Sequence, residues 1–161
     1  MKTKLLCYLG ALLLLSGLFC SCEKEPEASV IYYTEYCISS SETLVWSLSD
    51  QQIIHLRDLY LQFHDDLKRL SERHKWEKTA TKGNLPVGDE DAIAEFDNRL
   101  LPEVEELIST YQEEINALGF PDGDYFRLKI LCTLYKEIKI ADIVRHYSSY
   151  IAEHEFELKT N

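Results

Sequence analysis

Residues 49–74, SDQQIIHLRDLYLQFHDDLKRLSERH, carry the strongest structural signal in the sequence. Ser49 and Gln52 have the spacing of a capping box, in which two side chains satisfy free backbone N–H groups at a helix start. Mostly apolar side chains then recur at alternating steps of three and four, on one helical face: Ile53, Leu56, Tyr60, Phe63, Leu67, Leu70 and His74. We expect a long helix that packs through this face.

Residues 89–118 predict a second helix. The acidic residues 89–91 place negative charge on its first turn, where the helix dipole favours it, and Gly119 has the position of a left-handed cap. Its apolar face follows the same spacing: Ile93, Phe96, Leu100, Val104, Leu107, Tyr111, Ile115 and Leu118. Pro102 interrupts the pattern, and proline costs about 3 kcal/mol in a helix interior, so we expect a kink or restart near Leu101.

Residues 79–88 contain two glycines and a proline without periodicity, which predicts a loop between the two helices. So short a loop makes the helices antiparallel and brings the basic end of the first near the acidic start of the second. Exposed ion pairs contribute only about 0 to 1 kcal/mol each, so the apolar faces must hold this helical hairpin together.

Two segments have strand character. Residues 30–39 are rich in Tyr, Ile, Val and Thr, and residues 125–135 alternate apolar and polar side chains after a Pro121–Gly123 turn signal. The predicted fold class is therefore α+β, with a long antiparallel helical hairpin packed on a small antiparallel β-sheet. Residues 124–155 also suit helices, which would give a three-helix bundle instead, and both interpretations stay open here.

The first residues have the order of a signal peptide. Lys2 and Lys4 precede an apolar run from Leu5 to Phe19, and a small residue, Ser21, comes directly before Cys22. A membrane span needs about 20 apolar residues, so a retained anchor helix is the weaker interpretation of this run. We expect cleavage before Cys22.

Residues 18–22, LFCSC, resemble the lipobox of bacterial lipoproteins, and Cys22 is the predicted lipidation site. Bulky Phe19 before Cys20 makes that cysteine the poorer acceptor. Acidic residues then follow at 23, 25 and 27, similar to the export signals of small lipoproteins of the Bacteroidota. The resemblance is limited to the signal peptide, lipobox and acidic tether. It implies a palmitate-bearing outer-membrane lipoprotein of the cell envelope, either surface-exposed or periplasm-facing; a plain solvated tether is the alternative.

We therefore divide the chain into a signal peptide (1–21), a lipidated tether (22–28) and a single globular domain (29–161). Loss of Lys2 and Lys4 with the signal peptide changes the formal charge from −11 to −13. So acidic a protein is a poor partner for nucleic acid. It would also be repelled by an anionic bilayer, so the lipid must supply the membrane contact.

Cys37 and Cys132 remain in the mature domain once Cys22 carries lipid. The compartment outside the cytoplasm allows a disulfide between them. Two buried free thiols are the alternative, because unpaired cysteine is among the most buried residue types.

No catalytic, cofactor-binding or metal motif is recognisable, and we expect no cofactor. None of the five histidines has the spacing of a metal ligand set, and His64 with Asp65 and Asp66 is typical of a solvated helix face. The acidic positions 103, 105, 106, 113 and 114 follow the exposed face of the second helix. There is no glycine-rich phosphate loop and no nucleophile elbow.

Aromatic side chains outside the two helical faces are the candidate binding residues, since surface aromatics anchor proteins or stack on sugars. They are Tyr33, Trp46, Tyr125 and Tyr135. The favoured function is a non-enzymatic binding or assembly module for a protein or glycan partner. The alternatives are a small envelope hydrolase, or an inhibitor or immunity lipoprotein that docks through residues 79–88.

Overall fold

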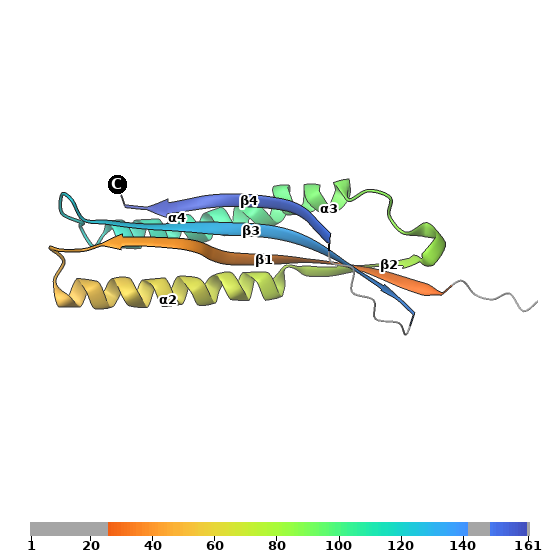
Figure 1. Cartoon of the computed structure of the whole chain (residues 1–161), viewed down its shortest axis with the longest axis horizontal. Helices are drawn as coiled ribbons and strands as arrows, with labels where there is room; N and C mark the ends of the chain where they lie inside the picture. The colour runs from red at the N-terminus through yellow and green to blue at the C-terminus, as the bar shows by residue number, and fades with distance from the viewer. Residues whose placement is uncertain (1–25, 142–148, 161) are drawn as a thin grey trace, which may run out of the picture.

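The computed structural model describes residues 26–141 and 149–160. It contains a four-stranded antiparallel sheet in the order β2-β1-β3-β4. The strands are β1 (Glu27–Leu44), β2 (Lys75–Thr81), β3 (Tyr125–Ile140) and β4 (Ser149–Lys159). The long helices α2 (Asp50–Arg73) and α4 (Leu101–Asn116) lie beside the sheet, and short α3 (Glu90–Glu95) precedes α4 (Figure 1). No helix in the described ranges has the length and apolar character needed to cross a bilayer.

The predicted helical hairpin on a small sheet is wrong. After α2 the chain enters β2, which pairs with β1 from Tyr33↔Lys75 to Glu27↔Thr81 before any second helix begins. Helix and strand make up roughly 42% and 40% of the structure, so the fold is mixed α+β with a large sheet. The three-helix alternative is also wrong, because β3 and β4 occupy the segments that it needed as helices.

Helix α2 begins where the sequence predicted. The Ser49 hydroxyl accepts from the Gln52 N–H, and the Gln52 side chain accepts from the Ser49 N–H, so the capping box is present. The helix ends at Arg73, with His74 as its C-cap, so Lys75 and Lys78 of the expected basic end lie in β2. Its buried face consists of Leu56, Leu59, Phe63, Leu67 and Leu70.

Pro102 is accommodated by a wider turn. Residues Phe96–Leu100 form a π-helical segment between α3 and α4, in which the Leu101 N–H donates to the Phe96 carbonyl. This puts the proline in the first turn of α4, where its missing N–H costs nothing. The predicted kink or restart near Leu101 takes the form of this π-turn, after which α4 begins.

The two turns next to β3 use glycine as predicted. Gly119 follows α4 with φ +67° and Gly123 precedes β3 with φ +93°, both in the region that disfavours side chains.

The two faces of the sheet differ. On one face, alternate side chains of β1 and β3 are buried against the helices, among them Val30, Tyr32 and Tyr36 on β1. β3 contributes Phe126, Leu128, Ile130, Cys132 and Leu134. The opposite face bears no helix among the described residues, although Ile31 and Thr133 are buried there as well. We call this opposite side the open face.

Candidate binding face

A row of aromatic side chains crosses the middle of the open face. The register pairs Tyr33 with Tyr135, and Tyr135 with Tyr150, so the three tyrosines lie side by side on β1, β3 and β4. Lys75 on β2 pairs with Tyr33 and extends the row to the fourth strand. The rings of Tyr33 and Tyr135 stack with centroids 5.2 Å apart. Tyr150 is 57% exposed, and its hydroxyl donates to Glu153 at 2.8 Å. The row is a compact aromatic centre on an exposed surface.

Two carboxylates, Glu35 and Glu153, lie beside this aromatic centre. Burial, together with the neighbouring Glu35 carboxylate, raises the pKa of Tyr135. The hydrogen bond to Glu153 likewise raises the pKa of Tyr150. Further along β4, Glu155 lies 3.2 Å from Lys129, and Glu157 lies 3.6 Å from Lys159. The open face therefore offers tyrosines within a partly compensated acidic rim.

The other two predicted aromatics form a separate group at the far end of the sheet. Leu44 pairs with Tyr125, and the backbone N–H of Trp46 donates to Asp124 at 3.1 Å. Trp46 is 81% exposed, and the Arg127 guanidinium lies 5.1 Å above the Tyr125 ring. Ten residues of strand separate this end from the aromatic centre, roughly 33 Å at about 3.3 Å per residue. Only a macromolecule can touch both groups at once.

The sequence therefore identified two residues of the aromatic centre, Tyr33 and Tyr135, and missed Tyr150. Tyr150 was assigned to a segment that suited helix and strand equally. The signal that would have decided the case is the alternation of Glu153, Glu155 and Glu157 with inward-facing residues, which is the period of a strand.

Cys37 and Cys132 lie on neighbouring strands, and both thiols are free in the structure. Their registers differ by one residue, because Cys132 pairs with Tyr36 and Cys37 pairs with Leu131. Side chains alternate between faces along a strand, so Cys132 points to the buried core and Cys37 to the open face. Burial raises the pKa of Cys132 to about 12 and also raises that of Cys37.

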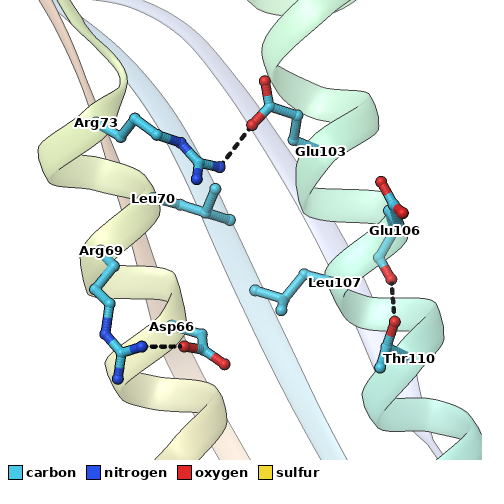
Figure 2. A pocket seen from close by; sticks show the side chains of 8 residues that line it. All are labelled: Asp66, Arg69, Leu70, Arg73, Glu103, Glu106, Leu107 and Thr110. Carbon is cyan, nitrogen blue, oxygen red and sulfur yellow. Dashed lines mark hydrogen bonds and ion pairs between the residues drawn. The ribbon is translucent and has the colours of Figure 1, made fainter.

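A hollow of about 440 Å³ lies between α2 and α4. Figure 2 shows Leu70 and Leu107 between the two helices, with an ion pair from Arg73 to Glu103 at 2.7 Å that spans the groove. Asp66 is held by Arg69 at 3.0 Å and also accepts from the Tyr111 hydroxyl at 2.8 Å. Most charges that line this groove therefore already have partners.

Glu103, which lines this groove, also ends a chain of hydrogen bonds that runs from Tyr36 through His74. His74 is 3% exposed, with Nδ1 2.8 Å from the Tyr36 hydroxyl and Nε2 3.1 Å from Glu103. If Nε2–H donates to the carboxylate, Nδ1 accepts from the tyrosine, which fits a neutral imidazole. Burial lowers the pKa of His74, and this outweighs the opposing effect of Glu103. For Glu103, the effect of burial is overcome by His74 and Arg73, which lower its pKa.

The sequence did not reveal this chain of hydrogen bonds, because its members lie on three different elements. It placed His74 on the packing face of the first helix and Glu103 on the exposed face of the second, without a contact between them. The remaining histidines that the structure describes do not form a metal site: no group of three or more His, Cys, Asp or Glu within residues 26–141 and 149–160 could hold an ion. Cys22, the signal peptide and tether residues 22–25 lie outside the described residues.

Comparison with known proteins adds no relative from which a function could be transferred. No protein-family model, no curated protein and no solved structure matches this chain. Any functional conclusion must come from the chain's own residues.

Proposed function

We propose that this protein is a cell-envelope lipoprotein whose domain binds a protein partner through the open face of its sheet. The observation that carries the proposal is the aromatic centre of Tyr33, Tyr135 and Tyr150, set within acidic side chains on the face that no described helix covers. Tyrosine is enriched at protein interfaces because it combines a large apolar ring with a hydrogen-bonding hydroxyl.

A protein partner fits this face better than a glycan does. Sugar binding uses the flat face of an aromatic ring, whereas Tyr33 and Tyr135 stack on one another with an interplanar angle of 18°. The second exposed group, at Trp46 and Tyr125, lies too far along the sheet for one small ligand to reach both. A broad protein surface can contact the two groups together.

The lipoprotein half of the proposal rests on the lipobox-like residues 18–22 and the acidic tether. Its test is metabolic labelling with an alkyne-bearing palmitate. Label on the wild type and on Cys20→Ala, but not on Cys22→Ala, supports it. Protease shaving of intact cells then distinguishes a surface-exposed domain, which is digested while a periplasmic control is spared, from a periplasm-facing one.

The binding half is tested by the size of the protein extracted from envelopes in a neutral detergent. We expect the wild type to elute in size-exclusion chromatography as a complex, and a Tyr33→Ser/Tyr135→Ser variant to elute alone. The matched control is Ile54→Ser/Leu61→Ser, which changes two half-exposed apolar side chains on α2 and should keep the complex. Loss of the complex in the control alone would contradict the proposal.

One observation favours a second candidate, the inhibitor or immunity lipoprotein. Within the predicted docking segment 79–88, Val87 is fully exposed on the loop between a 3₁₀ turn (Lys82–Asn84) and α3. An apolar side chain at a loop tip can enter a partner's cleft. If Val87→Asp rather than the tyrosine variant releases the partner, this candidate replaces the first.

We rank the hydrolase alternative below both. The groove between α2 and α4 is where such a site would lie, and it is lined by Glu103, whose carboxylate contacts the buried His74. A general base must reach its substrate, whereas the His74 ring is enclosed and both of its nitrogens already have partners.

A further inference from the structure

The outer edge of β4 presents backbone groups that point away from the sheet. The Thr160 N–H donates to the Phe126 carbonyl at 3.0 Å, so even-numbered positions here face β3. The Lys159 N–H faces the other way and donates to the Gln112 side chain at 3.0 Å. Backbone direction alternates along an antiparallel strand, so the N–H and C=O groups of the preceding odd positions also point outward. These positions are Glu153, Glu155 and Glu157.

The β4 edge is longer than the β2 edge on the opposite side of the sheet. No backbone group within residues 26–141 and 149–160 bonds to the outward N–H and C=O groups of these three glutamates. On the opposite side, β2 has only seven residues, and beyond it the Thr34 and Tyr36 N–H groups of β1 are taken by His74 O and Ser71 Oγ. A bulge between Ile38 and Ser40 then distorts the rest of that β1 edge.

The same three positions carry the charge that selects what can pair there. Their side chains lie on the open face. Glu155 and Glu157 form ion pairs there with two exposed lysines, Lys129 and Lys159. Antiparallel pairing with a second copy about Glu155 would set Glu155 against itself and Glu153 against Glu157. Like charges directly opposite destabilise a strand pair, so this edge disfavours self-association. A different strand that places positive charges opposite these glutamates would instead form a stable pair with β4.

We infer that β4 binds an extended, cationic segment of the partner protein as a fifth strand, with Lys or Arg at alternate positions facing Glu153, Glu155 and Glu157. Main-chain hydrogen bonds supply affinity and the alternating charges supply selectivity. Basic side chains on this strand also come close to the exposed ring of Tyr150, which can take a cation over its face. The inference rests on the proposed function and specifies the partner's chemistry and its mode of contact.

The probe is a fluorescent peptide of alternating Lys and Val, long enough to span Ala152 to Leu158, titrated against the protein purified in neutral detergent and followed by anisotropy. A peptide of the same composition with its lysines in one block should bind at least about tenfold more weakly, because it cannot match the alternation. Methylating the peptide's backbone nitrogens along one edge should also abolish binding. Equal binding of all three peptides would overturn the inference, leaving only charge attraction.

Two substitutions at one position separate backbone pairing from charge. Glu155→Ala removes the carboxylate and keeps the outward N–H, whereas Glu155→Pro removes both. Proline is tolerated in an edge strand where its N–H would face solvent, so the β3–β4 ladder should remain intact. We expect the proline variant to bind the alternating peptide at least about tenfold more weakly than the alanine variant. Equal affinities would show that no strand is added.

Glu157→Pro against Glu157→Ala repeats the comparison should Glu155→Pro fail to fold. The detergent-extracted complex tells the two claims apart. If Tyr33→Ser/Tyr135→Ser dissociates the complex while both proline variants leave it intact, the open face binds a partner but β4 adds no strand. If the tyrosine variant also leaves the complex intact, the proposed function itself is wrong.

Discussion

The two faces of this sheet are made by the same strands, yet they follow different rules. On β3, Ile130 is fully buried under the helices, while its neighbour Leu131 is only half-buried on the open face. The covered face joins apolar side chains of the sheet and the helices, and it also contains the polar chain Tyr36–His74–Glu103. The open face holds tyrosines and charges that meet mainly within the sheet. Stability is therefore concentrated on one face, which leaves the other free to be shaped by binding.

Truncating neighbouring side chains on opposite faces should give the greatest difference in unfolding free energy. Ile130→Ala leaves a cavity in the core and should cost about 2–5 kcal/mol of unfolding free energy. Leu131→Ala should cost less, about 1 kcal/mol, because its side chain is only half-buried. Urea unfolding of the two variants measures the difference. Equal losses would mean that the open face is covered in solution.

The polar chain on the covered face gives the next largest effect. Tyr36→Phe removes the hydroxyl that lies 2.8 Å from His74 Nδ1 and leaves a buried ring nitrogen without a partner. The expected loss is about 1–3 kcal/mol. The control is Tyr33→Phe on the open face, which should change the unfolding free energy far less. If Tyr36→Phe leaves the unfolding free energy unchanged, a water molecule must replace the hydroxyl.

The same chain predicts a pH dependence. Burial lowers the pKa of His74 below its ordinary value of 6.5, so the unfolded chain binds protons more readily than the folded one. Stability should be full above that value and fall as the pH drops below it. Glu103, whose folded pKa is also lowered, loses its stabilising contribution at lower pH, as it becomes protonated. Urea unfolding of the wild type and His74→Asn between neutral and mildly acidic pH measures the first step. If the unfolding free energy of His74→Asn falls with pH as steeply as that of the wild type, other groups cause this loss of stability.

The cysteines provide the mildest test of the two faces, because nothing is mutated. We expect a maleimide to label Cys37 slowly in the folded protein and to leave Cys132 unlabelled until urea is added, since Cys132 is fully buried and its pKa is raised to about 12. Mass spectrometry of the two peptides reports each thiol. A bridge between them would appear as no labelling at either site until reduction.

Local signals in the sequence predicted local structure well. Three predicted features depend on residues only a few positions apart, and all are found. They are the capping box at Ser49, the glycines at 119 and 123, and the kink or restart near Leu101. The error was β2. Its residues, KWEKTAT, show no clear alternation and only two half-buried apolar side chains, Trp76 and Ala80. It is a strand because β1 offers it hydrogen bonds from far away in the sequence.

The sequence predicted only part of the candidate site, because the rest depends on pairing between distant segments. Alternation within β1 and β3 already suggested that Tyr33 and Tyr135 share the other side of a sheet. Their direct pairing depends on register, which a single strand does not specify. Tyr150 and the glutamates of β4 join them only because β4 pairs with β3 as the outer strand. The link from His74 to Glu103 depends on how α2 and α4 pack, which no local pattern contains.

The proposed function requires that the open face, and not the solvent-exposed side of the helices, contacts the partner. A photo-crosslinking amino acid placed in cells at Tyr150 on the open face or at Leu61 on α2 tests it directly, since both side chains are more than half exposed. We expect a discrete crosslinked product from position 150 that disappears in the Tyr33→Ser/Tyr135→Ser background, and none from position 61. A product from position 61 alone, or one from position 150 that persists in that background, would contradict it.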